Sequence, residues 1–198
     1  MIDDLDRSLS ELLRLELPAS IVSQVGISFA APDNQFPPAA VSLPAIDLFL
    51  YDLQENRDLR SSEWVAERND DGSASRVRPP IRLDCSYLIT AWASTSSSNP
   101  AQDEHRMLGE VLKVLVRHPS LPDAILQGTL KGQRPPLPTT TLQPGRLQSL
   151  GEFWQALGGK PKAALTYTVT IALEVSAPVA AGAPVVDKIL KFKPGVGA

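Results

Sequence analysis

The chain of 198 residues contains few of the side chains from which active sites and metal sites are built. It has one cysteine, Cys85, and two histidines. A single cysteine excludes an internal disulfide framework, and so few thiol and imidazole groups argue against a zinc cluster or a cysteine–histidine nucleophile pair. The sequence also lacks a Gly-x-Ser-x-Gly elbow, a phosphate-binding loop and a dinucleotide-binding glycine motif. These absences favour a binding or assembly protein over an enzyme, and we expect no catalytic residue, cofactor or metal ion.

Long uninterrupted segments are missing too. The longer stretches that the 18 prolines leave uninterrupted include 1–17, 45–78, 81–99, 101–118 and 162–177. None of these stretches fits a long coiled coil or an apolar membrane span of ~20 residues. The first residues of the chain are acidic, whereas a secretory signal peptide begins with basic residues and continues with apolar ones. We therefore expect no secretion by the standard route and no insertion in a membrane.

Basic residues are not concentrated enough to indicate a nucleic-acid-binding surface. Residues 1–100 carry 15 acidic and 8 basic side chains, and residues 101–198 carry 7 acidic and 11 basic side chains. The net charge of the whole chain is −3, which does not support nucleic acid as the partner. The halves of opposite charge would instead allow copies of the chain to attract one another head to tail.

Two amphipathic helices are predicted. Leucines at positions 5, 9, 12 and 13 recur with helical spacing and predict a helix over 2–17. A second helix is predicted over 99–118, where Asn99 is a suitable N-cap, Pro100 occupies the first helical position and Gln102 would complete a capping box. The apolar stripe on each helix indicates that one side packs against a core.

Two long strands are predicted where apolar residues occupy every second position, at 81–93 and 165–175. Such alternation is typical of a sheet that has one face on the core and the other toward water. We therefore expect an α+β fold, with an antiparallel or mixed β-sheet and helices packed on one face. The expected organisation is a single α+β domain over 1–177, followed by a linker and a C-terminal arm over 178–198.

Shorter elements are predicted between these. We expect a hairpin tip or a mobile loop within the polar segment 54–80, a short helix over 150–157, and an edge strand or docking arm over 185–192. Short strands are predicted at 24–30, 46–53, 125–130 and 137–142.

Aromatic and basic side chains outside the expected core are the candidates for contacts with other proteins. Trp64 lies in the polar segment, where it is either an anchor for a partner or part of a local cluster. Trp92 has the outward parity of its strand and is covered either by another element or by a partner chain. The lysine-containing arm either adds a strand to a neighbouring sheet or protects an exposed edge. The candidate interface residues are Arg57, Arg60, Trp64, Arg76, Arg78, Trp92, Lys188, Lys191, Phe192 and Lys193.

Several runs of residues, taken in order, resemble a known family. The runs are Asp47-Leu48-Phe49-Leu50-Tyr51, Glu55-Asn56, Leu59-Arg60, Arg78-Pro79-Pro80-Ile81-Arg82-Leu83-Asp84, Tyr87-Leu88-Ile89-Thr90-Ala91-Trp92, Glu104-His105-Arg106-Met107-Leu108-Gly109, His118-Pro119, Leu126-Gln127-Gly128 and Phe153-Trp154-Gln155-Ala156-Leu157-Gly158-Gly159. Together they resemble the tail-terminator, or cap, proteins of phage-tail-like extracellular contractile injection systems. The chain departs from the usual pattern at Lys162-Ala163-Ala164, where a Pro-Ser pair is more common in this family.

The resemblance implies a structural role without catalysis. It implies a homohexameric ring on the distal end of an inner tube and a sheath, which stops their polymerisation and joins them. The implied partners are copies of the chain, the inner tube protein and the sheath protein, with no nucleic acid and no membrane. It also implies assembly in the cytoplasm into a particle that can be released from the cell. The alternatives are a baseplate or cargo-loading adaptor of the same particle, or a hydrolase that uses His105 with Asp103.

Overall fold

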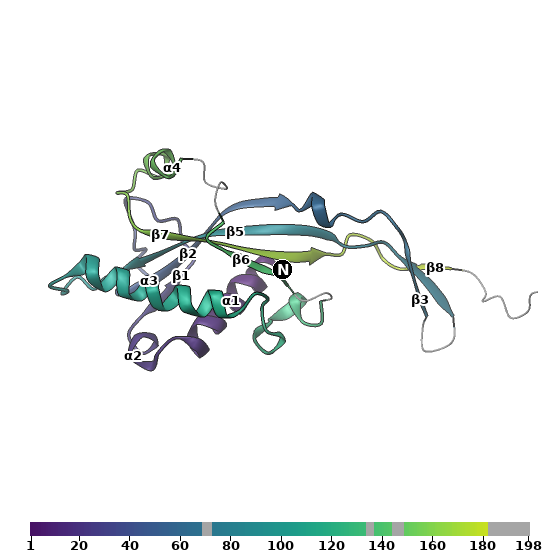
Figure 1. Cartoon of the computed structure of the whole chain (residues 1–198), viewed down its shortest axis with the longest axis horizontal. Coiled ribbons are helices and arrows are strands. Elements are labelled where there is room, and N and C mark those ends of the chain that lie inside the picture. Colours follow the sequence, from purple (N-terminus) through teal and green to yellow (C-terminus); the bar gives the residue numbers. More distant parts are fainter. Residues whose placement is uncertain (69–72, 134–136, 144–148, 182–198) are drawn as a thin grey trace, which may run out of the picture. The chain divides into compact units, whose positions relative to one another are not determined.

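The computed structural model describes residues 1–68, 73–133, 137–143 and 149–181, which belong to two compact units. The larger unit comprises Met1–Leu59 and Arg82–Ala172, and the smaller unit comprises Arg60–Ile81 and Leu173–Ala198 (Figure 1). The chain contains both helices and strands, and their order does not follow repeated βαβ units. The α+β fold class predicted from the sequence is therefore confirmed.

A five-stranded mixed sheet forms the centre of the larger unit. Its strand order is β1-β2-β5-β7-β6. The strand β1 runs parallel to β2, whereas β2 pairs with β5, and β6 with β7, in antiparallel register. The long alternating segments form β5 and β7, as predicted. The strands are β1 (Gly26–Ser28), β2 (Ala45–Glu55), β5 (Ile81–Trp92), β6 (Thr139–Thr141) and β7 (Ala164–Leu173).

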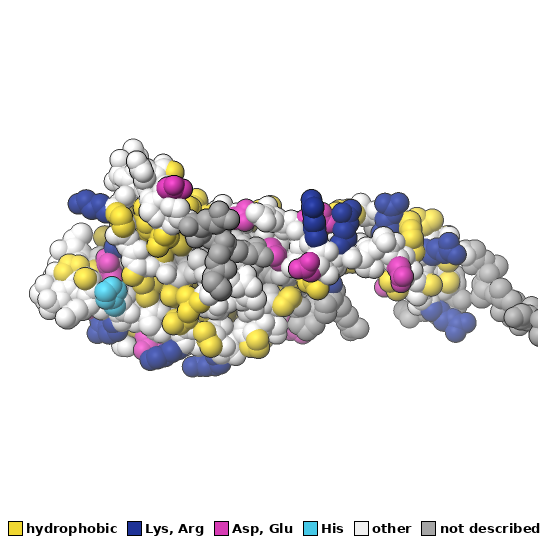
Figure 2. Space-filling view, turned by 45° about the horizontal axis from the view of Figure 1, so that its top comes forward, with side chains coloured by type: hydrophobic (Ala, Val, Ile, Leu, Met, Phe, Trp, Pro, Cys, Tyr) yellow, Lys and Arg dark blue, Asp and Glu magenta, His cyan; other side chains and the backbone are white. Residues whose placement is uncertain are grey.

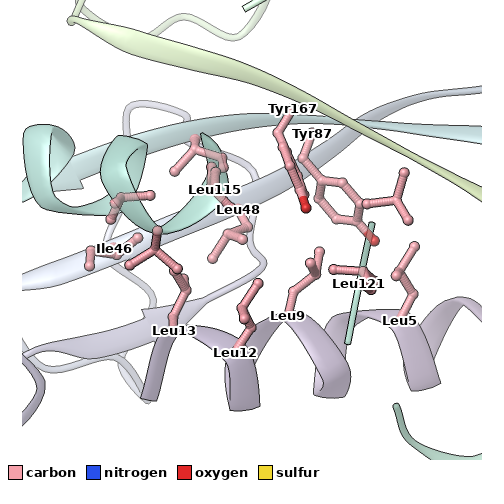
Figure 3. Packing of buried hydrophobic residues seen from close by; sticks show 14 of the residues in the cluster. Leu5, Leu9, Leu12, Leu13, Ile46, Leu48, Tyr87, Leu115, Leu121 and Tyr167 are labelled. Atoms are coloured by element: carbon pink, nitrogen blue, oxygen red, sulfur yellow. The ribbon is translucent and has the colours of Figure 1, made fainter. Parts of the chain in front are cut away.

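Two long helices cover the apolar face of this sheet, as the sequence predicts. They are α1 (Ile2–Glu16) and α3 (Pro100–Arg117), and a single turn, α2 (Ala19–Val22), follows α1. Figure 3 shows the leucines of α1 pointing toward the tyrosines of the sheet, Tyr87 and Tyr167. Leu5, Leu9, Leu12 and Leu13 are at most 1% exposed, and burying each stabilises the fold by about 1.5–3 kcal/mol relative to exposure. No helix in the described ranges combines the length and apolar character needed to cross a membrane.

The opposite face of the sheet is polar in composition, as the alternation predicts. The prediction that this face is exposed to water is wrong. Asp84, Ser86 and Thr90 of β5 and Thr168 and Thr170 of β7 are all buried. They can be buried because they bond to one another across the strands. The hydroxyls of Ser86 and Thr168 are 3.1 Å apart, and the Thr170 hydroxyl donates to the Asp84 carboxylate at 2.7 Å.

A third helix, α4 (Leu150–Ala156), lies on this second face of the sheet (Figure 1). Phe153 of α4 meets Phe49 and Tyr51 of β2, with ring centroids 6.3 and 5.9 Å apart. Trp154, the next residue, is 1% exposed. The helix was predicted over 150–157, but the face that it covers depends on contacts with a strand about 100 residues earlier in the chain, which helical periodicity does not reveal.

The strand predicted over 125–130 is absent, and two 3₁₀ turns replace it. They are η2 (Asp123–Ile125) and η3 (Gly128–Leu130). Gly128 has φ of +51°, which interrupts an extended strand. The N–H of Thr129 donates to the carboxylate of Asp4 rather than to a neighbouring strand. The apolar residues of this segment are still buried, but they reach the core from turns.

The capping box predicted at the start of α3 is also absent. Asn99 is the N-cap residue, but its side chain makes no capping hydrogen bond. The Ser97 hydroxyl instead accepts from the Asn99 N–H at 3.1 Å and donates to the Asp103 carboxylate at 2.6 Å. A serine two residues before the cap therefore ties the loop to the first turn of the helix.

The smaller unit contains a three-stranded antiparallel sheet in the order β3-β4-β8. Its strands are β3 (Val65–Arg68), β4 (Ala74–Val77) and β8 (Val179–Ala180). A short 3₁₀ turn, η1 (Arg57–Leu59), precedes this unit in the chain and belongs to the larger one. The hairpin predicted within 54–80 is confirmed by the antiparallel pairing of β3 with β4.

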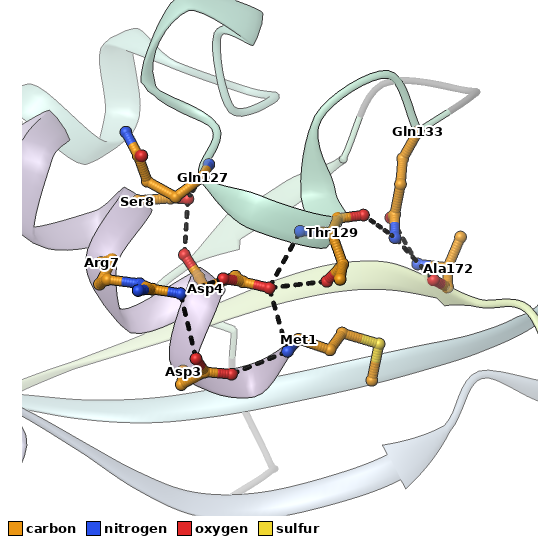
Figure 4. Close-up of polar contacts among 9 residues, drawn as sticks. All are labelled: Met1, Asp3, Asp4, Arg7, Ser8, Gln127, Thr129, Gln133 and Ala172. Atoms are coloured by element: carbon orange, nitrogen blue, oxygen red, sulfur yellow. Dashed lines mark hydrogen bonds and ion pairs between the residues drawn. The ribbon is translucent and has the colours of Figure 1, made fainter.

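A buried carboxylate, Asp4, ties the first turn of α1 to η3 (Figure 4). It accepts hydrogen bonds from the Thr129 hydroxyl at 2.7 Å and the Thr129 N–H at 3.0 Å, and it also contacts Arg7 and the amino group of Met1. These donors, the Thr129 hydroxyl first among them, hold the pKa of Asp4 well below its ordinary value of 3.8. The carboxylate also lies where a Cβ on Gly128 would be, so a side chain at position 128 would displace it.

Replacing Asp4 by asparagine should destabilise the protein in a manner that depends on pH. Because the pKa is lowered in the folded state, the stabilisation is complete above pH 3.8 and is lost as the pH falls below that value. Asp4→Asn should therefore unfold at a lower urea concentration than the wild type at neutral pH, and the difference should shrink in acid. Asp3→Asn, at a neighbouring side chain that is 74% exposed, is the matched control and should change the midpoint less. Equal midpoints for Asp4→Asn and the wild type at neutral pH would contradict this role.

Asp47 of β2 is fully buried on the second face of the sheet, and neither of its carboxylate oxygens has a hydrogen-bond partner among the described residues. Burial raises the pKa of Asp47 to about 7, and the neighbouring Ser28 hydroxyl and Ala30 N–H offset this only in part. The Ala30 N–H donates to Ser28 instead, at 3.2 Å.

Asp47 should make the folded state less stable as the pH rises from 3.8 to about 7, because the folded protein then binds the proton more tightly than the unfolded chain. The loss across this window is on the order of 4 kcal/mol. Asp47→Asn should abolish it, so that the unfolding free energy measured in urea changes less between these pH values. Asp52→Asn, on the same strand but only partly buried, should keep the wild-type dependence. An unchanged pH profile in Asp47→Asn would show that the carboxylate does not titrate in this range.

Candidate protein interface

The sequence-predicted interface residues lie in three parts of the chain. Arg60, Trp64, Arg76 and Arg78 belong to the smaller unit, where Figure 2 shows basic side chains gathered over its strands. In the larger unit, Arg57 is exposed in η1, and Trp92 ends β5. Lys188, Lys191, Phe192 and Lys193 lie outside the described residues.

Trp64 and Arg78 form a pair on the surface of the smaller unit. The guanidinium carbon of Arg78 is 5.0 Å from the centroid of the Trp64 ring, a cation–π contact worth about 0.5–1 kcal/mol at an exposed site. Trp64 is nevertheless 44% exposed. The pair borders a surface hollow of about 360 Å³, whose other walls include Arg60, Pro80 and Val175. Trp64 thus belongs to a local cluster and still presents a large part of its ring to the surface.

The two faces of the small sheet differ in charge. The register of β3, β4 and β8 brings Val65, Glu67, Ser75, Val77 and Ala180 to one face. The other face carries Ala66, Arg68, Ala74, Arg76 and Val179. Two arginines among small apolar residues therefore make the second face basic, which suits contact with carboxylates of a partner.

Trp92 is covered by other residues of the larger unit. Its ring stacks on Phe36, with centroids 4.3 Å apart, and the ammonium of Lys162 lies 4.2 Å from the ring centroid. Lys162 also forms an ion pair with Glu104 at 2.6 Å. Sequence reasoning did not find Phe36 and Lys162 as partners of Trp92, because residues so far apart in the chain share no spacing that could signal contact.

The cluster around Trp92 borders a second hollow, of about 550 Å³. Its lining includes Asp33, Asn34, His105 and Lys160 besides the stacked rings. The hollow therefore combines an aromatic floor with charged residues of both signs at its margins.

The structure does not bring His105 and Asp103 together as a catalytic pair. They are two positions apart on α3, so their side chains leave the helix in nearly opposite directions. The Asp103 carboxylate accepts from the Ser97 hydroxyl at 2.6 Å and from Arg106 at 3.2 Å. Cys85 is fully buried, and burial raises the pKa of its thiol to about 12, which leaves it protonated and unreactive. Within the described part of the chain, no three potential metal ligands lie close enough to hold an ion.

Comparison with known proteins connects this fold to particle caps. Over its whole length the chain is similar to the sheath/tube terminator of PVC, an extracellular contractile injection system, with 24% identity, a TM-score of 0.68 and 65% of that chain covered. Over 97% of its length it is also similar to the tube-terminating cap of the anti-feeding prophage AFP, with 26% identity, a TM-score of 0.66 and 61% of that chain covered. The chain thus spans somewhat less than two thirds of the length of each of these proteins. No curated protein sequence matches it significantly.

The family assignment rests on nearly the full chain. Residues 4–188 match the protein family described as the Pvc16 N-terminal domain. This range includes every strand of both described sheets and all residues of both units except 1–3 and 189–198. The chain therefore belongs to the Pvc16 N-terminal domain family.

Proposed function

We propose that this protein is a structural cap, or tail terminator, of an extracellular contractile injection system. In this role it forms a hexameric ring on the distal end of the inner tube and sheath and stops their polymerisation. The observation that carries the proposal is the family match over residues 4–188, and the similarity of the whole fold to two particle caps supports it. The protein acts by contact and not by catalysis, and it is assembled in the cytoplasm into a particle that leaves the cell.

A cap must bind the end of a filament whose subunits all present the same contact surface. A filament built by head-to-tail contacts grows until a subunit binds its end without offering the same surface for the next copy. Such a subunit needs a rigid body that binds the end and surfaces that bind its own copies. The larger unit, with a sheet buried on both faces, has the rigidity that this role requires.

The proposed contact surfaces are the exposed residues that the sequence singled out. Arg57, Arg60, Trp64, Arg76 and Arg78 would contact the tube, the sheath or a neighbouring copy. Aromatic and arginine side chains are enriched at the centres of such interfaces, because they bury large areas and form hydrogen bonds that have geometric specificity. Within the segment 178–198, β8 (Val179–Ala180) pairs with β4 of the same chain. The residues after β8, with Lys188, Lys191, Phe192 and Lys193, would serve as an arm to a neighbouring chain.

Loss of the protein should change the length of the particles. Deletion of its gene should give tubes and sheaths of broadly distributed length, or unstable distal ends, in negative-stain electron micrographs. A plasmid copy of the wild-type chain should restore the uniform length. A gold-labelled copy should appear at the end opposite the baseplate. Particles of normal length after deletion, or label at the baseplate, would refute the proposal; the second result would favour an adaptor instead.

Removing the exposed aromatic side chain should weaken incorporation into particles. Trp64→Ala deletes the ring that Arg78 covers and that remains 44% exposed, and a central aromatic contact contributes about 2 kcal/mol to an interface, or roughly a thirtyfold change in affinity. Quantitative immunoblots of purified particles should show the loss. Leu15→Ala, at a leucine of α1 that is 64% exposed, is the matched control and should be incorporated normally. Equal incorporation of both variants would exclude Trp64 as an anchor.

A further inference from the structure

The sheet of the smaller unit lacks a core of its own in the described part of the chain. Among residues 60–68, 73–81 and 173–181, only Ser75 is buried. Trp64, Val65, Val175 and Val179 are between 44% and 54% exposed. A sheet of two or three strands is marginally stable unless a hydrophobic face or a further element covers it. The exposure of the described residues of this unit therefore suits a surface that another molecule covers.

The two edge strands of this sheet have no further strand on their outer sides among the described residues. The order β3-β4-β8 places β3 at one edge and β8 at the other. All four residues of β3 and both residues of β8 are exposed. Neither strand contains a proline or a lysine, the residues most used to prevent edges from pairing, and the charged residues of β3 are limited to Glu67 and Arg68 at its end. Among the described residues, no strand covers the outer main-chain groups of β3 and β8, so these groups can accept a strand from another chain.

The directions of the two edge strands fit a ring. Because β3 and β8 are each antiparallel to β4, they run in the same direction. Rotation about a ring axis repeats one orientation of the subunit, so β3 of one copy would meet β8 of the next as a parallel pair. Every junction would then be the same, and no edge would be left over. Pairing of β3 with β3 would instead be two-fold and antiparallel, and it would close at two copies.

We propose that β3 of one copy pairs with β8 of the next, so that the small sheets join into one continuous sheet around the cap. This inference rests on the proposed hexameric ring and names the contact that closes it. Main-chain hydrogen bonds supply the pairing. Side chains on matching faces then become neighbours: Val65 and Ala180 on one face, Ala66 and Val179 on the other.

Pairs of cysteines on matching faces test the contact. The variants are Val65→Cys with Ala180→Cys, and Ala66→Cys with Val179→Cys, each pair in one chain. Within a chain β4 separates the two positions by two strand spacings, about 9.6 Å, which is too far for a disulfide. The native Cys85 is buried and does not compete. The matched control is Val65→Cys with Val179→Cys, whose side chains face opposite sides of the sheet.

Particles assembled in cells under reducing conditions are purified, oxidised and run on a denaturing gel without reductant. At least one matching-face variant should give a ladder of covalent oligomers up to the hexamer, with roughly tenfold more product than the opposite-face control, because only side chains on one face bring their Cβ atoms to about 4 Å. Reductant should collapse the ladder to monomer.

Three results separate the two proposals. If the particles are capped but neither matching-face variant gives more disulfide-linked product than the control, the edge contact is wrong and the cap function stands. If the single variant Val65→Cys forms disulfide-linked dimers, the contact between β3 and β8 is wrong and β3 pairs with β3 of a second copy. Wild-type particles whose distal ends lack the protein would instead refute the cap function itself.

Discussion

The sheet of the larger unit is buried on both faces, and this constraint shapes most of the molecule. On one face, leucines of α1 and apolar residues of α3 exclude water by simple packing. On the other face, hydroxyl and carboxylate groups of β5 and β7 are buried and must therefore bond to one another. The two faces are thus held together by different physical forces, and both fix the register of the same strands.

The buried polar face also explains why the pKa of Asp47 is raised. Asp84, on the same face, accepts from Thr170 and Asn56, whereas Asp47 has no comparable partner in the described chain. An unpaired buried acid costs stability when it ionises. Asp4 shows the opposite arrangement, since its donors stabilise the charged form and connect two segments that are 125 positions apart.

The sequence predicted the parts of the fold that depend on local pattern. The period of β5 and β7 and the leucine stripe of α1 reflect contacts with one continuous core, so alternation and helical spacing identified them. The turn at Gly128 escaped prediction because it depends on a distant carboxylate, that of Asp4. In the candidate interface, composition singled out Trp64 and Arg78 separately, but only the three-dimensional structure shows that the guanidinium covers the ring. The same holds for Trp92, whose partners come from two remote loops.

The three tryptophans occupy three different surroundings, and this gives the protein built-in optical reporters. Trp154 is fully buried, Trp92 is stacked between a phenylalanine and a lysine, and Trp64 is 44% exposed beside an arginine. Soluble quenchers such as iodide reach an exposed indole far more readily than a buried one. Quenchable emission from the isolated protein should therefore come mainly from Trp64, and emission at short wavelength from Trp154. Contact of the smaller unit with any other surface can then be followed in the unlabelled protein by the loss of quenching.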